Sequence, residues 1–383
     1  MREELFEYQK NNFDKHDFKQ CLTDPCMFIK RNTQSGHYLA VPVLVDDMIP
    51  TGKPQSIIDQ FLDDLAARFK IKRLGPTEWF SGIYISRDAN HTYMLQDAYS
   101  DQLTRKWGVQ TCDPTYQPQQ HGEDMYKLTY EALKPKVDST LDDEKPKLHD
   151  KTEVQSLASG IGWLVECTRP DLMFARMNCS RMQQKCTEGS WKLMKNVLRY
   201  IVHSRSYGIR YSKGTEFPNT LITFVDASLH TCAFTGRAAY CVIIFLNGGP
   251  IFWKCKLLPG KPSVSTLEAE YPATYFATNE TVYFRQLLYE MGFPQAGPTI
   301  IFGDNAAAQQ LASEHRVTHD NRHINMKYHA MRWTKEQGVC VYKHVPSADN
   351  PADIGTKIMI DKAAYLRFAL TVCHDCINQV KSG

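Results

Sequence analysis

The C-terminal half of this 383-residue chain predicts a mixed α/β fold organised around a five-stranded sheet. Apolar runs of strand length alternate with helix-like segments in the order β-β-β-α-β-α-β-α over residues 220–357. The sequence Asn247-Gly248-Gly249-Pro250 has the composition of a hairpin turn between two of these runs. The later strands follow helical crossovers, so we expect them to lie parallel to the first strand.

The expected strands of this domain are Leu221–Asp226, Tyr240–Leu246, Ile251–Leu257, Thr299–Asp304 and Val339–Val345. The first long helix opens at Ser265-x-x-Glu268, the pattern of a capping box, in which the two side chains accept hydrogen bonds from backbone amides at the helix start. A short Ala-rich helix, a helix over residues 324–336 and a final helix beginning near Asp349 complete the expected order.

Four carboxylates lie where these elements begin or end: Asp226, Glu270, Asp304 and Asp353. Acids at corresponding ends of strands and helices can converge at one edge of a sheet, where they repel one another and bound divalent cations relieve the repulsion. Two such ions, roughly 3.5–4 Å apart, hold a phosphodiester for in-line attack by water. The four acids therefore predict metal-dependent cleavage of nucleic acid. Each acid alone has a plainer interpretation, such as a helix N-cap at Asp304 or a first-turn residue favoured by the helix dipole at Glu270.

Residues 1–110 predict a smaller mixed α/β piece. Its strand-like run Leu39–Val45 leads directly into Asp46 and Asp47. Apolar residues then recur at helical spacing, and a second strand-like run covers Trp79–Ile85.

Residues 111–151 are rich in Pro, Gln, Asp and Lys and predict a surface linker. Residues 152–212 predict a helical connection, in which Thr168-Arg169-Pro170-Asp171 ends one helix and starts the next. The last helix of this connection has a basic face made of Lys192, Lys195 and Arg199. Such a face is usually only solvated, but it is compatible with binding a phosphate backbone.

The C-terminal motifs that carry a family resemblance are Phe224-Val225-Asp226-Ala227, Ser265-Thr266-Leu267-Glu268-Ala269-Glu270-Tyr271, Gly303-Asp304-Asn305, Arg322-His323-Ile324 and Ala348-Asp349-Asn350-Pro351-Ala352-Asp353-Ile354-Gly355-Thr356-Lys357. In register over residues 220–357, they resemble the RNase H domain of copia-type LTR retrotransposon Pol polyproteins. The motif Thr168-Arg169-Pro170-Asp171 resembles the helical connection of the same polyproteins. Leu44-Val45-Asp46-Asp47-Met48 resembles the later part of their reverse transcriptase.

The resemblance implies an RNase H-type endoribonuclease that hydrolyses the RNA strand of RNA–DNA hybrids with two Mg²⁺ or Mn²⁺ ions. The residues that it assigns to the ions are Asp226, Glu270, Asp304 and Asp353. We also expect His323 to act in proton transfer or product release, and Arg322 to contact nucleic acid. The hybrid would be recognised by its shape and its 2′-hydroxyl groups, and other domains of the Pol polyprotein are candidate partners.

The paired acids Asp46 and Asp47 suit two-metal polymerisation, which needs a further carboxylate from an earlier strand. In the family, that acid comes from sequence that would precede Met1. Pro42 also removes a ladder hydrogen bond from the strand that delivers the pair. We therefore expect residues 1–110 to be a truncated palm and thumb piece of a reverse transcriptase, without polymerase activity of its own.

Two positions depart from the RNase H pattern of the family. Pro272 follows Glu270 by two residues, and an interior helix proline costs roughly 3 kcal/mol unless it lies in the first turn. Asn325 stands where the family has an acid. Two alternative hypotheses remain: a catalytically decayed remnant that binds nucleic acid, and a nuclease that acts on another duplex or junction.

The composition, with 43% hydrophobic residues, 23% charged residues and a net charge of +3, fits a globular protein. The charged N-terminus predicts no signal peptide, and the longest apolar stretch, Ala238–Leu246, is shorter than the ~20 residues of a membrane span. We therefore expect a cytoplasmic or nuclear protein that is not secreted and that keeps its 12 cysteines reduced. Within the expected C-terminal tail, residues 358–383, Cys373-His374-Asp375-Cys376 has only half of a zinc-ligand spacing.

Overall fold

The computed structural model describes residues 18–32, 34–45, 47–113, 115–119, 130, 150–183, 187–216, 218–232, 234–313 and 325–376. Most of the expected linker over residues 111–151 lies outside these ranges. The chain divides into a smaller unit, Met1–Thr77 with Val282–Ala296, and a larger unit, Glu78–Thr281 with Gly297–Gly383. None of the helices in the described ranges combines the length and apolar character that crossing a bilayer requires.

The smaller unit contains an antiparallel sheet and helix α2. Its described elements are β1 (Lys19–Gln20), β2 (Met27–Asn32), β3 (His37–Leu44), β4 (Asp47–Met48), β5 (Thr51–Lys53) and α2 (Gln55–Ala66). The strand order is β1-β2-β3-β4, with β5 also paired to β3. Apolar residues of α2 pack on a core of Phe18, Phe28, Leu39, Val41 and Val43. The strand and the amphipathic helix predicted for this part of the chain are thus confirmed.

The larger unit contains the mixed five-stranded sheet that the sequence predicts. Its strands are β10 (Leu221–Ser228), β11 (Ala239–Leu246), β12 (Gly249–Leu257), β13 (Thr299–Gly303) and β14 (Cys340–His344). They lie in the order β12-β11-β10-β13-β14, with β12, β11 and β10 antiparallel and β13 and β14 parallel to β10. Asn247 and Gly248, with φ of 51° and 78°, form the turn of the predicted hairpin. The sheet has the expected RNase H-like arrangement.

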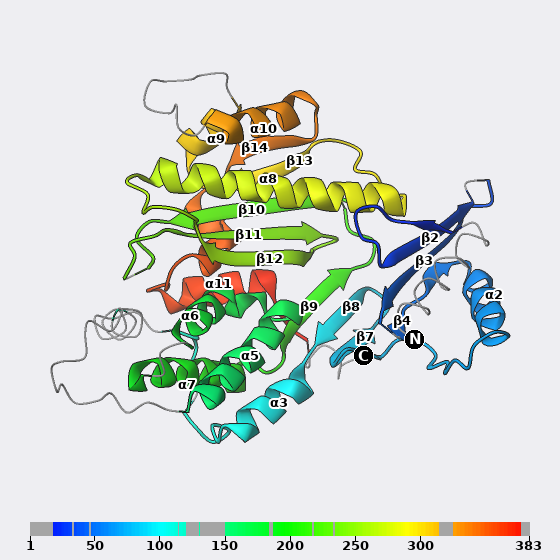
Figure 1. The fold of residues 1–383 in the computed structure, drawn as a ribbon, viewed down its shortest axis with the longest axis horizontal. Helices are drawn as coiled ribbons and strands as arrows, with labels where there is room; N and C mark the ends of the chain where they lie inside the picture. Colours follow the sequence, from blue (N-terminus) through cyan, green and yellow to red (C-terminus); the bar gives the residue numbers. More distant parts are fainter. Residues whose placement is uncertain are drawn as a thin grey trace. The chain divides into compact units, whose positions relative to one another are not determined.

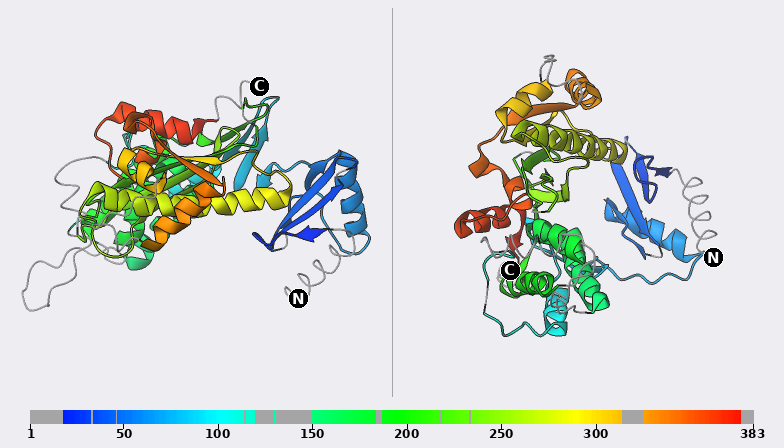
Figure 2. Two further views of the ribbon diagram at one scale, coloured as in Figure 1. Left: turned by 90° about the horizontal axis from the view of Figure 1, so that it is seen from above. Right: turned by 60° about the vertical axis from the view of Figure 1, so that its left-hand side comes forward.

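Helices cover both faces of this sheet (Figures 1 and 2). α8 (Thr266–Met291) lies along one face, where the ring of Phe276 stacks on Tyr240. The helices of the other face are α5 (Lys151–Cys167), α6 (Met173–Met182) and α11 (Lys362–Val372). There the indole of Trp253 donates a hydrogen bond to the carbonyl of Val165 at 2.6 Å. α9 (Ala306–Ser313) and α10 (Asn325–Glu336) pack beside β13 and β14.

A second sheet of the larger unit has the strand order β15-β9-β8-β7-β6. Its strands are β6 (Trp79–Phe80), β7 (Ile83–Arg87), β8 (His91–Leu95), β9 (Tyr207–Ser212) and β15 (His374–Asp375). Two further α-helices in the described part of this unit are α3 (Asp97–Lys106) and α7 (Glu188–His203). The single strand predicted over residues 79–85 is wrong. Ser81 and Gly82 adopt φ of 48° and 75°, which turns this segment into the β6–β7 hairpin.

The helix predicted to begin near Asp349 is also wrong. Two 3₁₀ turns, η3 (Ser347–Asp349) and η4 (Pro351–Gly355), occupy this segment, and α11 begins only later. The side-chain amide of Asn350, between the two turns, donates to the carbonyl of Val225 at 3.0 Å. This bond holds the chain against β10, and Pro351 has no N–H to offer a preceding helical turn, so a continuous α-helix does not form here.

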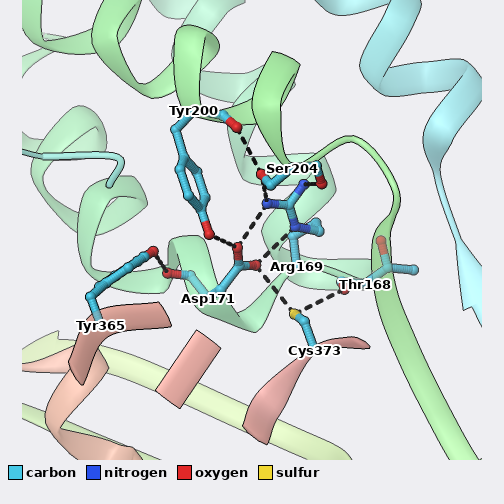
Figure 3. A network of polar contacts seen from close by, with 7 residues as sticks. All are labelled: Thr168, Arg169, Asp171, Tyr200, Ser204, Tyr365 and Cys373. Atoms are coloured by element: carbon cyan, nitrogen blue, oxygen red, sulfur yellow. Dashed lines mark hydrogen bonds and ion pairs between the residues drawn. The ribbon is translucent and has the colours of Figure 1, made fainter. Parts of the chain in front are cut away.

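A buried ion pair joins the helical segment to the C-terminal helix (Figure 3). Arg169 donates to the two carboxylate oxygens of Asp171 at 2.9 and 2.7 Å, and neither side chain is more than 1% exposed. Tyr200 of α7 donates to the same carboxylate, and Arg169 also bonds Ser204. Tyr365 of α11 donates to the backbone carbonyl of Asp171 at 3.0 Å. The motif predicted to separate two helices therefore also holds α7 and α11 together.

The cysteine pair with half of a zinc spacing has other partners. The thiol of Cys373 donates to the carboxylate of Asp171 at 3.3 Å, and that of Cys376 donates to the carbonyl of His374 at 3.2 Å. All cysteines in the described ranges are free thiols. The hydrogen bonds of Cys373 and Cys376 thus give this pair a structural role.

We expect Arg169→Met to lower the free energy of unfolding by roughly 3–5 kcal/mol, because it leaves the buried Asp171 carboxylate without its counter-charge. Chemical denaturation of the wild type and the variant measures this difference. Arg205→Met is the matched control, since Arg205 and Asp101 form an ion pair whose side chains are 60% and 40% exposed. Loss of that pair should cost no more than about 1 kcal/mol. If the two variants lose the same free energy of unfolding, the buried pair does not stabilise the fold more than an exposed one.

Candidate metal centre

Two of the predicted acids are brought side by side by the pairing of parallel strands. Asp226 is the sixth residue of β10, and Asp304 directly follows β13. The parallel register pairs Val225 with Gly303, so the next residue of each strand is an aspartate at the same edge of the sheet. Asn305, whose side chain accepts the N–H of Ala308, is the residue that caps α9. Asp304 therefore does not cap α9.

Glu270 reaches the same edge from the first turns of α8. The predicted capping box forms: the N–H of Glu268 donates to Ser265 Oγ at 3.2 Å, and Glu268 Oε2 accepts the N–H of Val264 at 2.8 Å. Two residues later, Glu270 Oε1 accepts the N–H of Ala227 at 3.2 Å. This bond ties the carboxylate of Glu270 to the end of β10, whereas Glu268 serves the helix start.

Asp226, Glu270 and Asp304 form one cluster. One carboxylate oxygen from each lies within 4.8 Å of the other two. Asp226 and Glu270 are only 2% and 4% exposed, whereas Asp304 is half-buried and accepts a hydrogen bond from the Ser347 hydroxyl at 2.6 Å. The cluster is thus closed on the side of the core and open to solvent at Asp304.

Asp353 lies beside this cluster, on the 3₁₀ turn η4. Its side chain is buried, and its Oδ2 forms an ion pair with Lys357 Nζ at 2.8 Å. Thr356, at the end of the same turn, donates a hydrogen bond from its hydroxyl to Asp226 Oδ2. Asp226 is therefore common to both sides of the site, with Glu270 and Asp304 on one side and the turn that carries Asp353 on the other.

Burial and mutual repulsion shift the acids toward their protonated forms. Burial, together with the charges of Asp353 and Asp304, raises the pKa of Asp226 to about 8. Burial, together with Asp226 and Asp304, raises the pKa of Glu270 well above its ordinary value. Burial also raises the pKa of Asp353, although the bond with Lys357 opposes this. Ionised together, these carboxylates need additional positive charge.

Two buried carboxylate oxygens of the site have no hydrogen-bond partner: Glu270 Oε2 and Asp353 Oδ1. A buried charged oxygen without a donor is costly unless a cation coordinates it. All the donors are carboxylate oxygens, the ligand type that Mg²⁺ and Mn²⁺ prefer. The residues present therefore fit a hard divalent cation, and the group of Asp226, Glu270 and Asp304 can hold one.

The structure describes both positions that depart from the family pattern, Pro272 and Asn325. α8 continues through Pro272 from Thr266 to Met291, and Glu270 keeps its place in the cluster. Pro272 therefore removes one helical hydrogen bond without displacing the acid. Asn325 is the first residue of α10.

The other predicted site residues lie elsewhere or outside the described ranges. Lys192, Lys195 and Arg199 lie on α7, which packs against α3, α5 and α6. Arg199 donates to the carbonyl of Asp113, and Lys195 lies over the ring of Trp191. Asp47 is exposed on β4 of the smaller unit. The remaining three, Asp46, Arg322 and His323, lie outside the described residues.

Four residues that surround the acids escaped the sequence analysis of the site: Ser347, Asn350, Thr356 and Lys357. Ser347 bonds Asp304, Thr356 bonds Asp226 and Lys357 pairs with Asp353. Asn350 bonds the carbonyl of Val225 in β10. A signal was present, since three of the four fall inside the C-terminal motif that supported the family resemblance. Only the folded turn, however, shows which acid each of them meets.

Comparison with known proteins links the chain to retrotransposon Pol sequences. A family profile described as reverse transcriptase (RNA-dependent DNA polymerase) matches residues 7–121. The chain is 28% and 27% identical to the retrovirus-related Pol polyproteins from transposons RE2 and RE1 of Arabidopsis thaliana, each over 92% of its length. It is 24% identical to that from transposon TNT 1-94 of Nicotiana tabacum, over 89% of its length. The chain spans 23%, 22% and 25% of these three relatives.

Solved structures of RNases H are also similar to this chain. The crystal structure of LC11-RNase H1 in complex with RNA/DNA hybrid matches at 17% identity and a TM-score of 0.28, over 38% of this chain and 99% of that one. RNase H1 from Halobacterium salinarum matches at 17% identity and a TM-score of 0.27, over 36% and 94% of the two chains. The fold is identified from the strand order and pairing of the sheet.

Without divalent ions, we expect the stability of the larger unit to fall as the pH rises toward about 8, because the pKa of Asp226 is raised to about 8 from 3.8. A carboxyl group with a raised folded-state pKa contributes its full stability below its unfolded pKa and loses that contribution as the pH passes the folded value. In EDTA, the melting temperature of Asp226→Asn should therefore fall less than that of the wild type between about pH 6 and pH 9. If the melting temperatures of the two proteins fall equally over this pH range, groups other than Asp226 cause the pH dependence.

Proposed function

Because the chain belongs to the copia-type retrotransposon Pol family, we propose that its carboxylate site hydrolyses the RNA strand of RNA–DNA hybrids with two Mg²⁺ or Mn²⁺ ions. One observation carries the proposal. Asp226, Glu270 and Asp304 converge at the end of β10, and Asp353 lies on the turn bonded to Asp226. Two buried oxygens of this group have no donor to satisfy them.

The carboxylates have different tasks in the proposed reaction. Asp226, which is common to both sides, would help to hold both ions. Glu270 and Asp304 would complete one set of ligands, and Asp353 would complete the other. Bound there, the ions would supply activation of a water molecule and stabilisation of the charge that develops on the leaving 3′-oxygen. Asp304 is the more exposed acid, so we infer that the scissile phosphate approaches from its side.

Recognition of the hybrid is proposed to depend on its shape and its 2′-hydroxyl groups, without reading of the base sequence. Lys192, Lys195 and Arg199 on α7 are proposed contacts to the phosphate backbone, as is Arg322. His323 is proposed to assist proton transfer or product release. Other domains of a Pol polyprotein are the proposed protein partners.

The reverse-transcriptase segment is not proposed to polymerise DNA by itself. Two-metal polymerisation requires carboxylates from neighbouring strands to converge. Asp47 is exposed on a two-residue strand, and within the described part of the chain it belongs to no cluster of three possible metal ligands.

Cleavage of a labelled RNA–DNA hybrid in the presence of Mg²⁺ tests the proposed nuclease. The wild type should cut the RNA strand and lose this activity in EDTA. Asp226→Asn and Glu270→Gln should each reduce the cleavage rate roughly 100-fold or more, because each removes a charged ligand.

Glu268→Gln is the matched control for Glu270→Gln. It makes the same chemical change two residues away on the same helix, and a glutamine can still serve in the capping box. Its cleavage rate should stay near that of the wild type. If the wild type and the Asp226→Asn variant cut equally poorly while both bind the hybrid, the chain is a nucleic-acid-binding remnant. Cleavage of duplex DNA at the same rate as the hybrid would favour a nuclease with another substrate.

A further inference from the structure

Lys357 brings a positive charge into the carboxylate site from within the chain. Its ammonium lies 2.8 Å from Asp353 Oδ2, and the two residues are four positions apart across the end of η4. The carboxylate side chain is 7% exposed, whereas the lysine side chain is 44% exposed. The acid is thus fixed in the protein, and the lysine lies at its solvent side.

The ammonium acts on more than its immediate partner. Burial lowers the pKa of Lys357, but the bond with Asp353 and the charges of Asp226 and Asp304 outweigh this effect and raise it. Lys357 therefore supplies positive charge to a group of acids that would otherwise repel one another. Among the described ion pairs, this one alone includes one of the four acids, Asp353.

The two sides of the site are consequently unequal. Asp226, Glu270 and Asp304 meet without an intervening ammonium, and Glu270 Oε2 has no partner. A divalent ion that binds to Asp226, Glu270 and Asp304 therefore does not displace an ammonium group. On the other side, Oδ1 of Asp353 has no partner, but Oδ2 is already paired. An ion between Asp226 and Asp353 must compete with the ammonium or lie close to it, which like-charge repulsion disfavours.

We propose that Lys357 is a positioning residue that competes with the second divalent ion: it neutralises Asp353 in the ion-free protein and swings toward solvent when that ion binds. The first ion then binds to Asp226, Glu270 and Asp304, and the second binds more weakly. The movement is feasible because a lysine stem has several rotatable bonds and its head group already reaches water. This inference rests on the proposed two-ion site.

Calorimetric titration of the full chain with Mn²⁺, in the absence of nucleic acid, tests the competition. The wild type should bind two ions, the second roughly tenfold or more weakly than the first. In Lys357→Met, the second ion should bind roughly tenfold more tightly, while binding of the first changes less. Lys357→Arg keeps the charge and should behave as the wild type. Electron paramagnetic resonance should detect the spin-coupled Mn²⁺ pair at a lower Mn²⁺ concentration in Lys357→Met.

Lys254→Met is the matched control, since Lys254 also forms an ion pair with a carboxylate, that of Glu280 at 2.6 Å. Glu280 lies ten residues beyond Glu270 on α8, about 15 Å along the helix, so Mn²⁺ binding should be unchanged. If Lys357→Met binds the second ion as weakly as the wild type, or more weakly, the competition is refuted while the two-ion site stands. If the wild type binds no Mn²⁺ at all, the proposed function fails and the competition fails with it.

Discussion

The parallel pairing of β10 with β13 is the constraint on which the carboxylate site depends. Val225 of β10 pairs with Gly303 of β13. The residues that come next, Asp226 and Asp304, are therefore neighbours at one edge of the sheet. A slip of one residue would move one of them to the other face. Close packing supports the register: a side chain on Gly303 would collide with the amide of Gln309, and one on Gly355 with the thiol of Cys241. Glycine at these positions lets α9 approach β13 and lets η4 approach β11.

Packing and electrostatics oppose one another at this edge. Helices cover both faces of the sheet and bury its apolar residues, which stabilises the strands by the hydrophobic effect. The same burial removes Asp226 and Glu270 from water and raises their pKa values. The surrounding fold holds the acids in an arrangement that their own charges disfavour, which is typical of functional sites. A bound divalent cation would relieve this repulsion, and Lys357 relieves part of it on the side of Asp353.

The second buried polar centre of the larger unit, the ion pair of Arg169 and Asp171, differs from the carboxylate site because its charges balance. The Arg169–Asp171 pair is as deeply buried as Asp226 and Glu270, but each charge has its counter-charge. Asp171 also accepts a hydrogen bond from Tyr200, and Arg169 also donates one to Ser204. Its satisfied bonds suit a structural role, in which η1 (Pro170–Leu172), α7 and α11 are held together. The carboxylate site keeps unpaired oxygens, as a site that binds a ligand does, whereas the Arg169–Asp171 pair is fully bonded, as a structural pair is.

Local patterns in the chain were sufficient for the order of the five strands along the sequence, the hairpin turn at Asn247 and Gly248 and the helix start at Ser265, because periodicity, turn chemistry and capping act between near neighbours. They also singled out Asp226, Glu270 and Asp304, which the fold brings together. They misplaced the strand over residues 79–85 and the last helix, where left-handed turn residues and a long-range bond from Asn350 to β10 prevail. Which acids meet and which of their oxygens stay unpaired were decided only by the folded chain. Those features depend on strand register and burial, which join residues more than forty positions apart and leave no local trace.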